Sequence, residues 1–72
     1  MGRLKKQFGE RLQELRQRAG ISQEQLADAI GVTVISVSNM ERGIFGPRFD
    51  NLEKIARTLK VPVKTLFEFG KE

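Results

Sequence analysis

Apolar residues recur along the chain at helical spacing, and short segments rich in Gly, Pro or capping residues separate these repeats. No stretch alternates apolar and polar residues for long enough to form a half-buried strand, whose side chains repeat every two residues. The pattern therefore predicts an all-α fold. We expect a compact bundle of five helices with short connections, in one domain over residues 1–72.

The first two predicted helices have clear ends. A helix over about 4–19 carries an apolar stripe at steps of three and four residues, formed by Leu4, Phe8, Leu12 and Leu15. Gly20 suits the left-handed conformation in which many helices end. Ser22 and Gln25 fit a capping box that starts the second helix, and Gly31 ends it.

The next two helices are less sharply bounded. The third is expected to begin after Thr33, an N-cap residue, and to run to about Arg42. The fourth covers about 49–59, and two starts are compatible with the residues there. Asp50 and Glu53 resemble a capping box, but a start one or two residues earlier is equally compatible.

A fifth, short helix is expected near the end of the chain. Pro62 suits its first turn, because proline lacks the N–H that a first turn leaves unpaired. Its apolar residues are Val63, Leu66 and Phe67. It would complete a five-helix domain around one small core.

Composition limits the chemistry. The chain has no Cys and no His, so neither a thiolate nor an imidazole can act as nucleophile, general base or metal ligand. We therefore expect no catalytic residues, no metal, no cofactor and no enzymatic activity. Thirteen Lys and Arg against nine Asp and Glu give a net charge of +4. That balance favours a polyanionic partner, either nucleic acid or an anionic membrane surface.

The sequence carries no sign of a membrane or secreted protein. No apolar run approaches the roughly 20 residues of a membrane span. The basic start of the chain is not followed by the apolar core of a secretory signal. We therefore expect a cytoplasmic protein without a membrane partner.

Residues 23–42 carry the most informative pattern. Ala27 lies where the second helix should cross the third, and its small side chain lets the two backbones approach. Gly31, four residues later, can adopt positive φ and turn the chain sharply. Val37 and Met40 point from the third helix back into the core. Two short helices joined in this way form a helix-turn-helix, which offers its second helix to the DNA major groove.

The chain resembles the lambda-repressor-like helix-turn-helix family, also called the XRE or Cro-type family. The matching segments, in order, are FGERLQELRQRAGISQEQLADAIGV, SVSNMERG and PRFDNLEKIARTLKVPVKTLF. The resemblance implies a five-helix fold, in agreement with the helix count above. It also implies a transcriptional regulator that binds double-stranded DNA in a sequence-specific manner. We expect a repressor, and activation is the alternative. Family members usually bind as homodimers on pseudo-palindromic operators, whose half-sites lie ~34 Å apart.

The resemblance also implies roles for individual residues. DNA base contacts would come from the outward side of the third helix, from Thr33, Val34, Ile35, Ser36 and Asn39. Gln23 would bond a DNA phosphate, a role that suits a helix N-terminus. Arg48 would reach the phosphate backbone or the minor groove. Arg16 would pair with Glu41 and pin the recognition helix to the first helix.

Two base-contact positions depart from the family pattern. Val34 and Ile35 stand where the family often has polar residues, and neither can bond a base edge. Each can touch a thymine methyl group, so we expect a preference for thymine there. Asn39 is expected to make the polar base contact, for instance to adenine. Two alternatives remain: a shifted register puts one of the apolar residues in the core, or the pair meets a protein.

A second hypothesis is a protein-interaction module, such as an antitoxin or the partner of a regulator. It would use an apolar patch of Val34, Ile35, Ile44 and Phe45. The salt dependence of binding distinguishes the two hypotheses. Binding to DNA phosphates weakens steeply as the salt concentration rises, whereas an apolar contact should barely respond. A homodimer would use the domain itself, plausibly through Phe45, Phe69 and neighbouring residues of the last helices.

Overall fold

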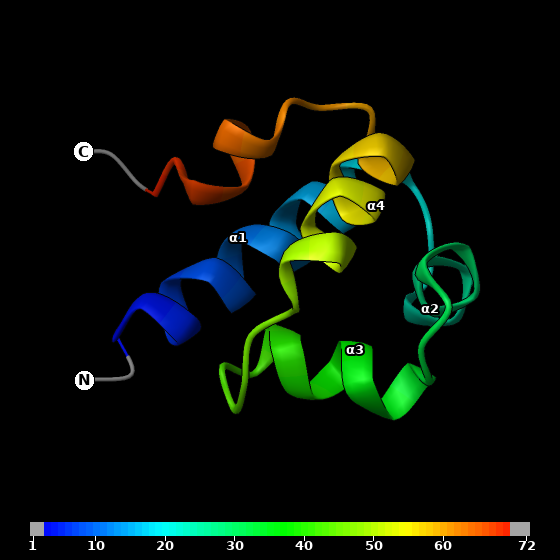
Figure 1. The fold of residues 1–72 in the computed structure, drawn as a ribbon, viewed down its shortest axis with the longest axis horizontal. Coiled ribbons are helices and arrows are strands. Elements are labelled where there is room, and N and C mark those ends of the chain that lie inside the picture. The colour runs from blue at the N-terminus through cyan, green and yellow to red at the C-terminus, as the bar shows by residue number, and fades with distance from the viewer. Residues whose placement is uncertain (1–2, 70–72) are drawn as a thin grey trace.

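The computed structural model describes residues 3–69, which form four α-helices and one 3₁₀ helix. Their bounds are α1 (Arg3–Ala19), α2 (Gln23–Ile30), α3 (Val34–Glu41), α4 (Phe49–Leu59) and η1 (Val63–Phe67). No strand occurs among these residues, so the all-α prediction is confirmed. In Figure 1, α3 lies along one edge of the molecule, and it packs against α1 and α2. The 3₁₀ helix η1 closes the opposite side, over α1 and α4.

All five elements contribute to one apolar core. Its fully buried side chains are Leu12, Leu26, Ile30, Met40, Ile55, Leu66 and Val37. The predicted stripe of α1 is buried at Phe8, Leu12 and Leu15 but not at Leu4, which is exposed. Leu4 departs from the predicted stripe because it lies at an open hollow beside Phe49 and Leu52 and not within the closed core.

The predicted ends of the first two helices are confirmed. The Ser22 hydroxyl accepts a hydrogen bond from the Gln25 N–H at 3.0 Å, and the Gln25 amide oxygen accepts one from the Ser22 N–H at 2.8 Å. Gly20 and Gly31 have positive φ, at 75° and 77°. The Gly31 N–H also donates to the Ala27 carbonyl. Local hydrogen bonds and glycine conformation thus set the turn between α2 and α3.

The fourth helix takes the earlier of its two compatible starts. It begins at Phe49 with Arg48 as N-cap, and no side chain caps its first turn. Asp50 therefore lies inside the helix, where its charge suits the positive end of the helix dipole.

The prediction of a fifth α-helix is wrong. Residues Val63–Phe67 form a 3₁₀ helix with Pro62 as its N-cap, outside the first turn. The Thr65 N–H donates to the Pro62 carbonyl, three residues back. Hydrogen bonds to the third residue back define a 3₁₀ helix, which is used in short pieces. Leu66 is buried and Phe67 lies against Phe8, with ring centroids 5.3 Å apart. Side-chain packing therefore holds this short segment in place, without the hydrogen bonds to the fourth residue back that define an α-helix.

A close contact between α1 and α3 was not foreseen from the sequence. A Cβ atom on Gly9 would lie against the carbonyl oxygens of Met40 and Glu41, 2.6 Å from that of Glu41. Only glycine fits there without moving one of the helices. The backbone of α1 thereby supports the end of α3.

Candidate nucleic-acid interface

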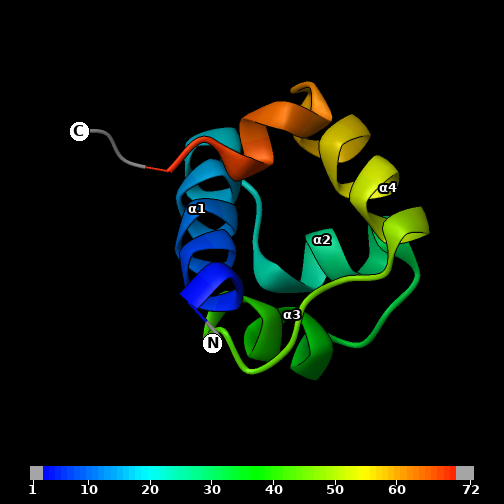
Figure 2. The ribbon, with the colours of Figure 1, turned by 60° about the vertical axis from the view of Figure 1, so that its left-hand side comes forward.

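One side of α3 is buried and the other is free. Val37, Met40 and Glu41 face the interior. The opposite side meets no other element in either view of the fold (Figure 2). The helix starts at Thr33, whose hydroxyl accepts from the Ser36 N–H at 3.1 Å. The predicted N-cap is therefore confirmed. The helix α3 packs against the rest of the domain through one side only.

The free side of α3 carries a row at helical spacing. Ile35, Asn39 and Arg42 follow one another at steps of four and three residues, so they share one side. Ile35 is 69% exposed, Arg42 is exposed, and Asn39 is half-buried. The DNA contacts predicted from the sequence do not include Arg42, although its spacing of seven residues from Ile35, about two turns, places it on the same side.

The other predicted base-contact residues flank this row. Val34 is exposed and lines a hollow shared with Glu24 and Asp28 of α2. Ser36 is half-buried, and its hydroxyl oxygen lies 3.1 Å from the Thr33 hydroxyl. Neither Val34 nor Ile35 is buried, so the alternative of a shifted register is wrong.

The four apolar residues of the alternative patch separate into two pairs. Val34 and Ile35 begin α3, whereas Ile44 and Phe45 follow its end, about 12 Å along an eight-residue helix. Val34 lines the hollow against α2, and Phe45 lines a different one, beside the start of α4. All four are exposed, but α3 itself separates the pairs.

Arg16 and Glu41 form a buried, bidentate ion pair between α1 and α3. The Nε atom of Arg16 lies 2.6 Å from one carboxylate oxygen of Glu41, and an Nη atom lies 3.2 Å from the other. The side chains are only 11% and 2% exposed. Another Nη of Arg16 donates to the Ile21 carbonyl at 2.9 Å. The guanidinium therefore links α1, the turn before α2 and the end of α3.

Gln23 belongs to the same network. Its Nε2 donates to a carboxylate oxygen of Glu41 at 2.9 Å, and the side chain is half-buried. Glu41 thus accepts three hydrogen bonds from two residues, all of them donated by nitrogen. The first residue of α2 is thereby tied to the last residue of α3.

Two cations lie beside the helix-turn-helix on the α4 side. Arg48 is exposed at the start of α4, and Lys54 lies one turn and a half further along. Both line a hollow of about 550 Å³ that also contains Ser36 and Phe45. Positive charge therefore borders α3 near this hollow as well as at its end, where Arg42 lies.

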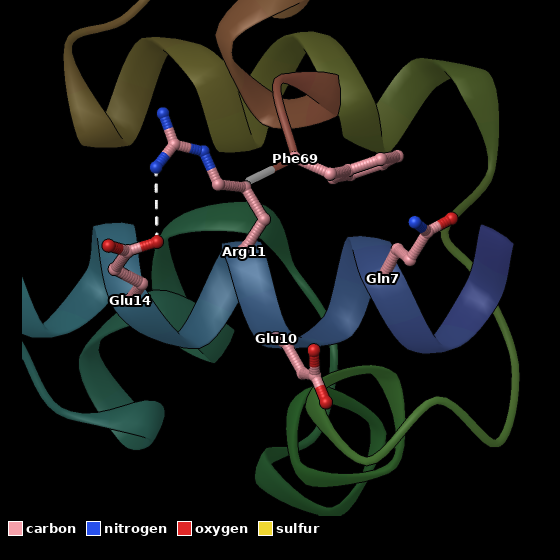
Figure 3. A pocket seen from close by; sticks show the side chains of 5 residues that line it. All are labelled: Gln7, Glu10, Arg11, Glu14 and Phe69. Carbon is pink, nitrogen blue, oxygen red and sulfur yellow. Dashed lines mark hydrogen bonds and ion pairs between the residues drawn. The ribbon is translucent and has the colours of Figure 1, made fainter. Parts of the chain in front are cut away.

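Phe69 does not occupy the position expected for a contact residue. It is half-buried and packs against the core, with its ring 6.2 Å from that of Phe67 in an edge-on arrangement. It also lines a polar hollow on α1 beside Arg11 (Figure 3). Arg11 donates to the Thr65 carbonyl at 3.0 Å and so ties down the same segment. The expectation that Phe69 is exposed is therefore wrong, whereas its role in a dimer contact stays a prediction.

No helix within residues 3–69 has both the length and the apolar character that crossing a membrane requires.

Comparison with known proteins places this geometry in a family. The helix-turn-helix family model matches residues 12–66. The transcriptional regulator DdrOP3 of Deinococcus deserti is 37% identical over 59 residues. That match covers 82% of this chain but only 46% of the regulator, so the chain spans about half the length of that relative.

Two solved structures have the same fold. The restriction-modification controller protein C.AhdI from Aeromonas hydrophila is 39% identical, with a TM-score of 0.81, covering 86% of this chain and 94% of that one. The P22 c2 repressor, solved in complex with a synthetic operator, is 28% identical with a TM-score of 0.79. It covers 85% of this chain and 92% of its own. The chain therefore belongs to the helix-turn-helix family of DNA-binding transcriptional regulators.

Proposed function

We propose that this protein is a repressor that binds a pseudo-palindromic operator as two copies, each inserting α3 into the major groove of one half-site. The observation that carries the proposal is the row of Ile35, Asn39 and Arg42 on the free side of a helix whose other side is buried. A helix is narrow enough to enter the major groove, where each base pair presents a distinct pattern. The likeness to the operator-bound P22 c2 repressor supports this use of α3.

Base reading is assigned to the start and middle of α3. Val34 and Ile35 contact thymine methyl groups, and the Asn39 amide bonds adenine, whose edge offers one donor and one acceptor. Thr33 and Ser36 contact bases at the start of the helix. The Thr33 hydroxyl accepts the Ser36 N–H and donates to the Ser36 hydroxyl oxygen at 3.1 Å, so both of these bonds are made within the cap of α3. We therefore expect Ile35 and Asn39 to carry most of the sequence preference.

Phosphate binding is assigned to residues on both sides of α3. Gln23 keeps one Nε2 hydrogen for a phosphate after bonding Glu41, because an amide nitrogen carries two. Arg48 lies at the start of α4 with its side chain exposed. These contacts set the position of the protein on the duplex, and Ile35 and Asn39 then read the sequence.

Selection from a randomised duplex library at ~0.15 M salt tests the proposal. We expect enrichment of a twofold-symmetric sequence with thymine-rich positions in each half-site. Ile35→Ala should relax the thymine preference, and Asn39→Ala should relax a different position, each by about 1–3 kcal/mol of discrimination. Failure to enrich any sequence would overturn the proposal.

The salt dependence of binding provides a second test. Arg48→Ala should weaken binding to all sequences alike and reduce the slope of log affinity against log salt by about one. Arg57→Ala is the matched control, because Arg57 is an exposed cation in the last turn of α4, at the opposite end of that helix from Arg48. An equal loss of slope in both variants would assign the effect to overall charge and remove Arg48 from the interface.

A further inference from the structure

The start of α1 and the end of α3 meet at a corner of the molecule that carries positive charge. A Cβ atom on Gly43, the second residue after α3, would lie 2.8 Å from the Cα atom of Lys6 and 3.3 Å from its Cβ atom. Figures 1 and 2 both show the first turn of α1 beside the turn that follows α3. Lys5, Lys6 and Arg42 are exposed here, and we call these three residues the basic corner.

Helix geometry directs the two lysines toward this turn. Gly9 is a residue of α1 that faces the end of α3, since a Cβ atom on it would lie 2.6 Å from the Glu41 carbonyl oxygen. Lys5 and Lys6 precede Gly9 by four and three residues, so they lie on the same side of α1, one turn nearer its start. Helix side chains lean toward the start of their own helix, so both lysines extend past the end of α3 into solvent.

The cations of this corner have no partner in the part of the chain that the structure describes. Arg11, Arg16 and Arg18, from the middle and end of α1, each form an ion pair with a glutamate. The three residues of the basic corner form no ion pair with any residue within 3–69. The fold therefore uses the later cations of α1 internally and leaves the basic corner available to an anion outside the chain.

Nearby acidic residues do not neutralise the corner. Glu41 ends α3, but its side chain is 2% exposed and is paired with Arg16. Glu10 is exposed one turn after Lys6, so it offsets one charge. Arg3 also lies in the first turn of α1, so the cations here outnumber the exposed acid four to one. The local potential therefore stays positive.

The start of α4, on the far side of the turn, does not change this balance. It carries two acids, Asp50 and Glu53, and two cations, Arg48 and Lys54. Asp50 lines the hollow beside the turn together with both of these cations. That side is therefore close to neutral and leaves the charge of the basic corner uncompensated.

The first turn of a helix is also an unfavourable place for cations. The helix dipole is positive at this end, so acidic residues stabilise a first turn and cations destabilise it. The first turn of α1 has no acidic residue and carries Arg3, Lys5 and Lys6. Departures from such local rules are expected where residues serve a function. Binding of an external anion accounts for a charge arrangement from which α1 itself gains nothing.

The place of the corner selects DNA phosphates as that anion. In a helix-turn-helix, the start of the recognition helix contacts the base edges. The end of the same helix then lies nearer to the strand of phosphates that borders the groove. The basic corner lies at this end of α3. Lysine is a flexible point charge, which suits a phosphate contact that carries no sequence information.

We propose that the basic corner, formed by Lys5 and Lys6 of α1 with Arg42 at the end of α3, binds phosphates of one duplex strand. The DNA interface thereby extends beyond the helix-turn-helix to the first helix. The place of this contact on an operator rests on the proposed function. The attraction to duplex phosphates does not require a particular sequence.

Fluorescence anisotropy over a series of salt concentrations tests the proposal on two probes, a random-sequence duplex and the duplex enriched from the library. The double variant Lys5→Gln with Lys6→Gln should bind both about 30-fold more weakly at ~0.15 M salt. Its slope of log affinity against log salt should fall by about two, because two phosphate contacts are lost. Arg42→Gln alone should reduce the slope by about one.

Two further double variants serve as controls. Lys5→Arg with Lys6→Arg keeps both charges and should bind like the natural chain. Arg57→Gln with Lys64→Gln removes two exposed cations from the end of α4 and from η1. It should change the affinity by no more than about twofold, because salt screens charges that lie far from the phosphates.

The urea midpoint separates this role from a purely structural one. Removing cations from the first turn of α1 should leave the midpoint unchanged or raise it. If Lys6 instead serves only to stabilise the end of α3, the glutamine variant will have a lower midpoint and an unchanged salt slope. That pair of results would overturn the proposal.

Three other results would also overturn it. They are a glutamine variant at Lys5 and Lys6 that binds like the natural chain, an equal loss of slope in the Arg57 and Lys64 control, and an altered sequence preference of the glutamine variant in library selection. A natural chain that binds no duplex would overturn both this inference and the proposed function. If no sequence is enriched but the random-sequence duplex shows the expected differences in slope, the proposed function fails and this inference stands.

Discussion

The inner and outer sides of α3 differ in almost every physical respect. The inner side is buried, meets the α1 backbone at Gly9, and ends in a carboxylate that accepts three hydrogen bonds. The outer side carries Ile35 and Arg42 in solvent, and the Arg42 side chain makes no hydrogen bond or ion pair with any residue within 3–69. One eight-residue helix thus carries inner residues that are constrained by packing and outer residues that are not.

Because the two sides differ in this way, a small domain can change the DNA sequence that it prefers without losing its fold. Contacts on the inner side fix the position and angle of α3 relative to α1 and α2. Substitutions on the outer side leave the packing of the core unchanged. We therefore expect substitutions on α3 to fall into two classes. Inner changes lower the free energy of unfolding, and outer changes alter DNA preference.

The largest expected effect comes from breaking the buried ion pair. Arg16→Ala should lower the free energy of unfolding by about 3 kcal/mol, because it leaves the Glu41 carboxylate buried and without its charged partner. Urea denaturation measures the loss. Arg18→Ala is the matched control, since Arg18 pairs with Glu14 on the surface of the same helix, where ion pairs contribute little. An unchanged urea midpoint for Arg16→Ala would refute this assignment.

A smaller effect is expected at the helix crossing. Gly9→Ala should cost about 2 kcal/mol, because the new methyl group meets carbonyl oxygens at the end of α3. Gly46→Ala provides the comparison, since a Cβ there meets nothing within 4 Å. Thermal melting of both variants gives the measurement. Equal melting temperatures would mean that α1 and α3 separate at little cost and that α1 does not hold α3 rigidly.

The N-cap of α3 has a smaller expected effect, because it stabilises only the first turn of the helix, which is exposed. Thr33→Ala should cost about 1 kcal/mol by removing the acceptor for the Ser36 N–H. Thr33→Ser keeps that acceptor and should restore most of the stability. If serine fails to restore it, the threonine methyl group and not the cap bond contributes the stability.

The smallest effect on stability is expected on the outer side. Ile35→Ala should change the free energy of unfolding by less than about 0.5 kcal/mol, because its side chain is largely in solvent. Met40→Ala, on the inner side of the same helix, should cost at least about 2 kcal/mol. Similar urea midpoints for the two variants would abolish the distinction between the two sides of α3.

The sequence by itself determined the features that depend on near neighbours in the chain. The capping box of Ser22 and Gln25, the cap at Thr33 and the positive φ of Gly31 are formed by bonds and torsions within a few residues. Helical spacing likewise predicted most of the core, because an apolar stripe must turn inward. These local rules were enough to locate the helix-turn-helix, whereas the predicted DNA contacts on α3 came from the family resemblance.

Tertiary structure alone decided what depends on contacts between distant segments. The exposure of Leu4, the packing of half-buried Phe69 against the core and the 3₁₀ form of η1 follow from contacts with neighbouring elements. The tie between Gln23 and Glu41 spans 18 residues and needs the folded turn to form. The hollow lined by Leu4, Pro47, Leu52 and Phe67 is formed by four separate segments, so periodicity within one helix does not predict it. A residue's spacing predicts which side of its helix it lies on, but only packing decides whether that side is covered.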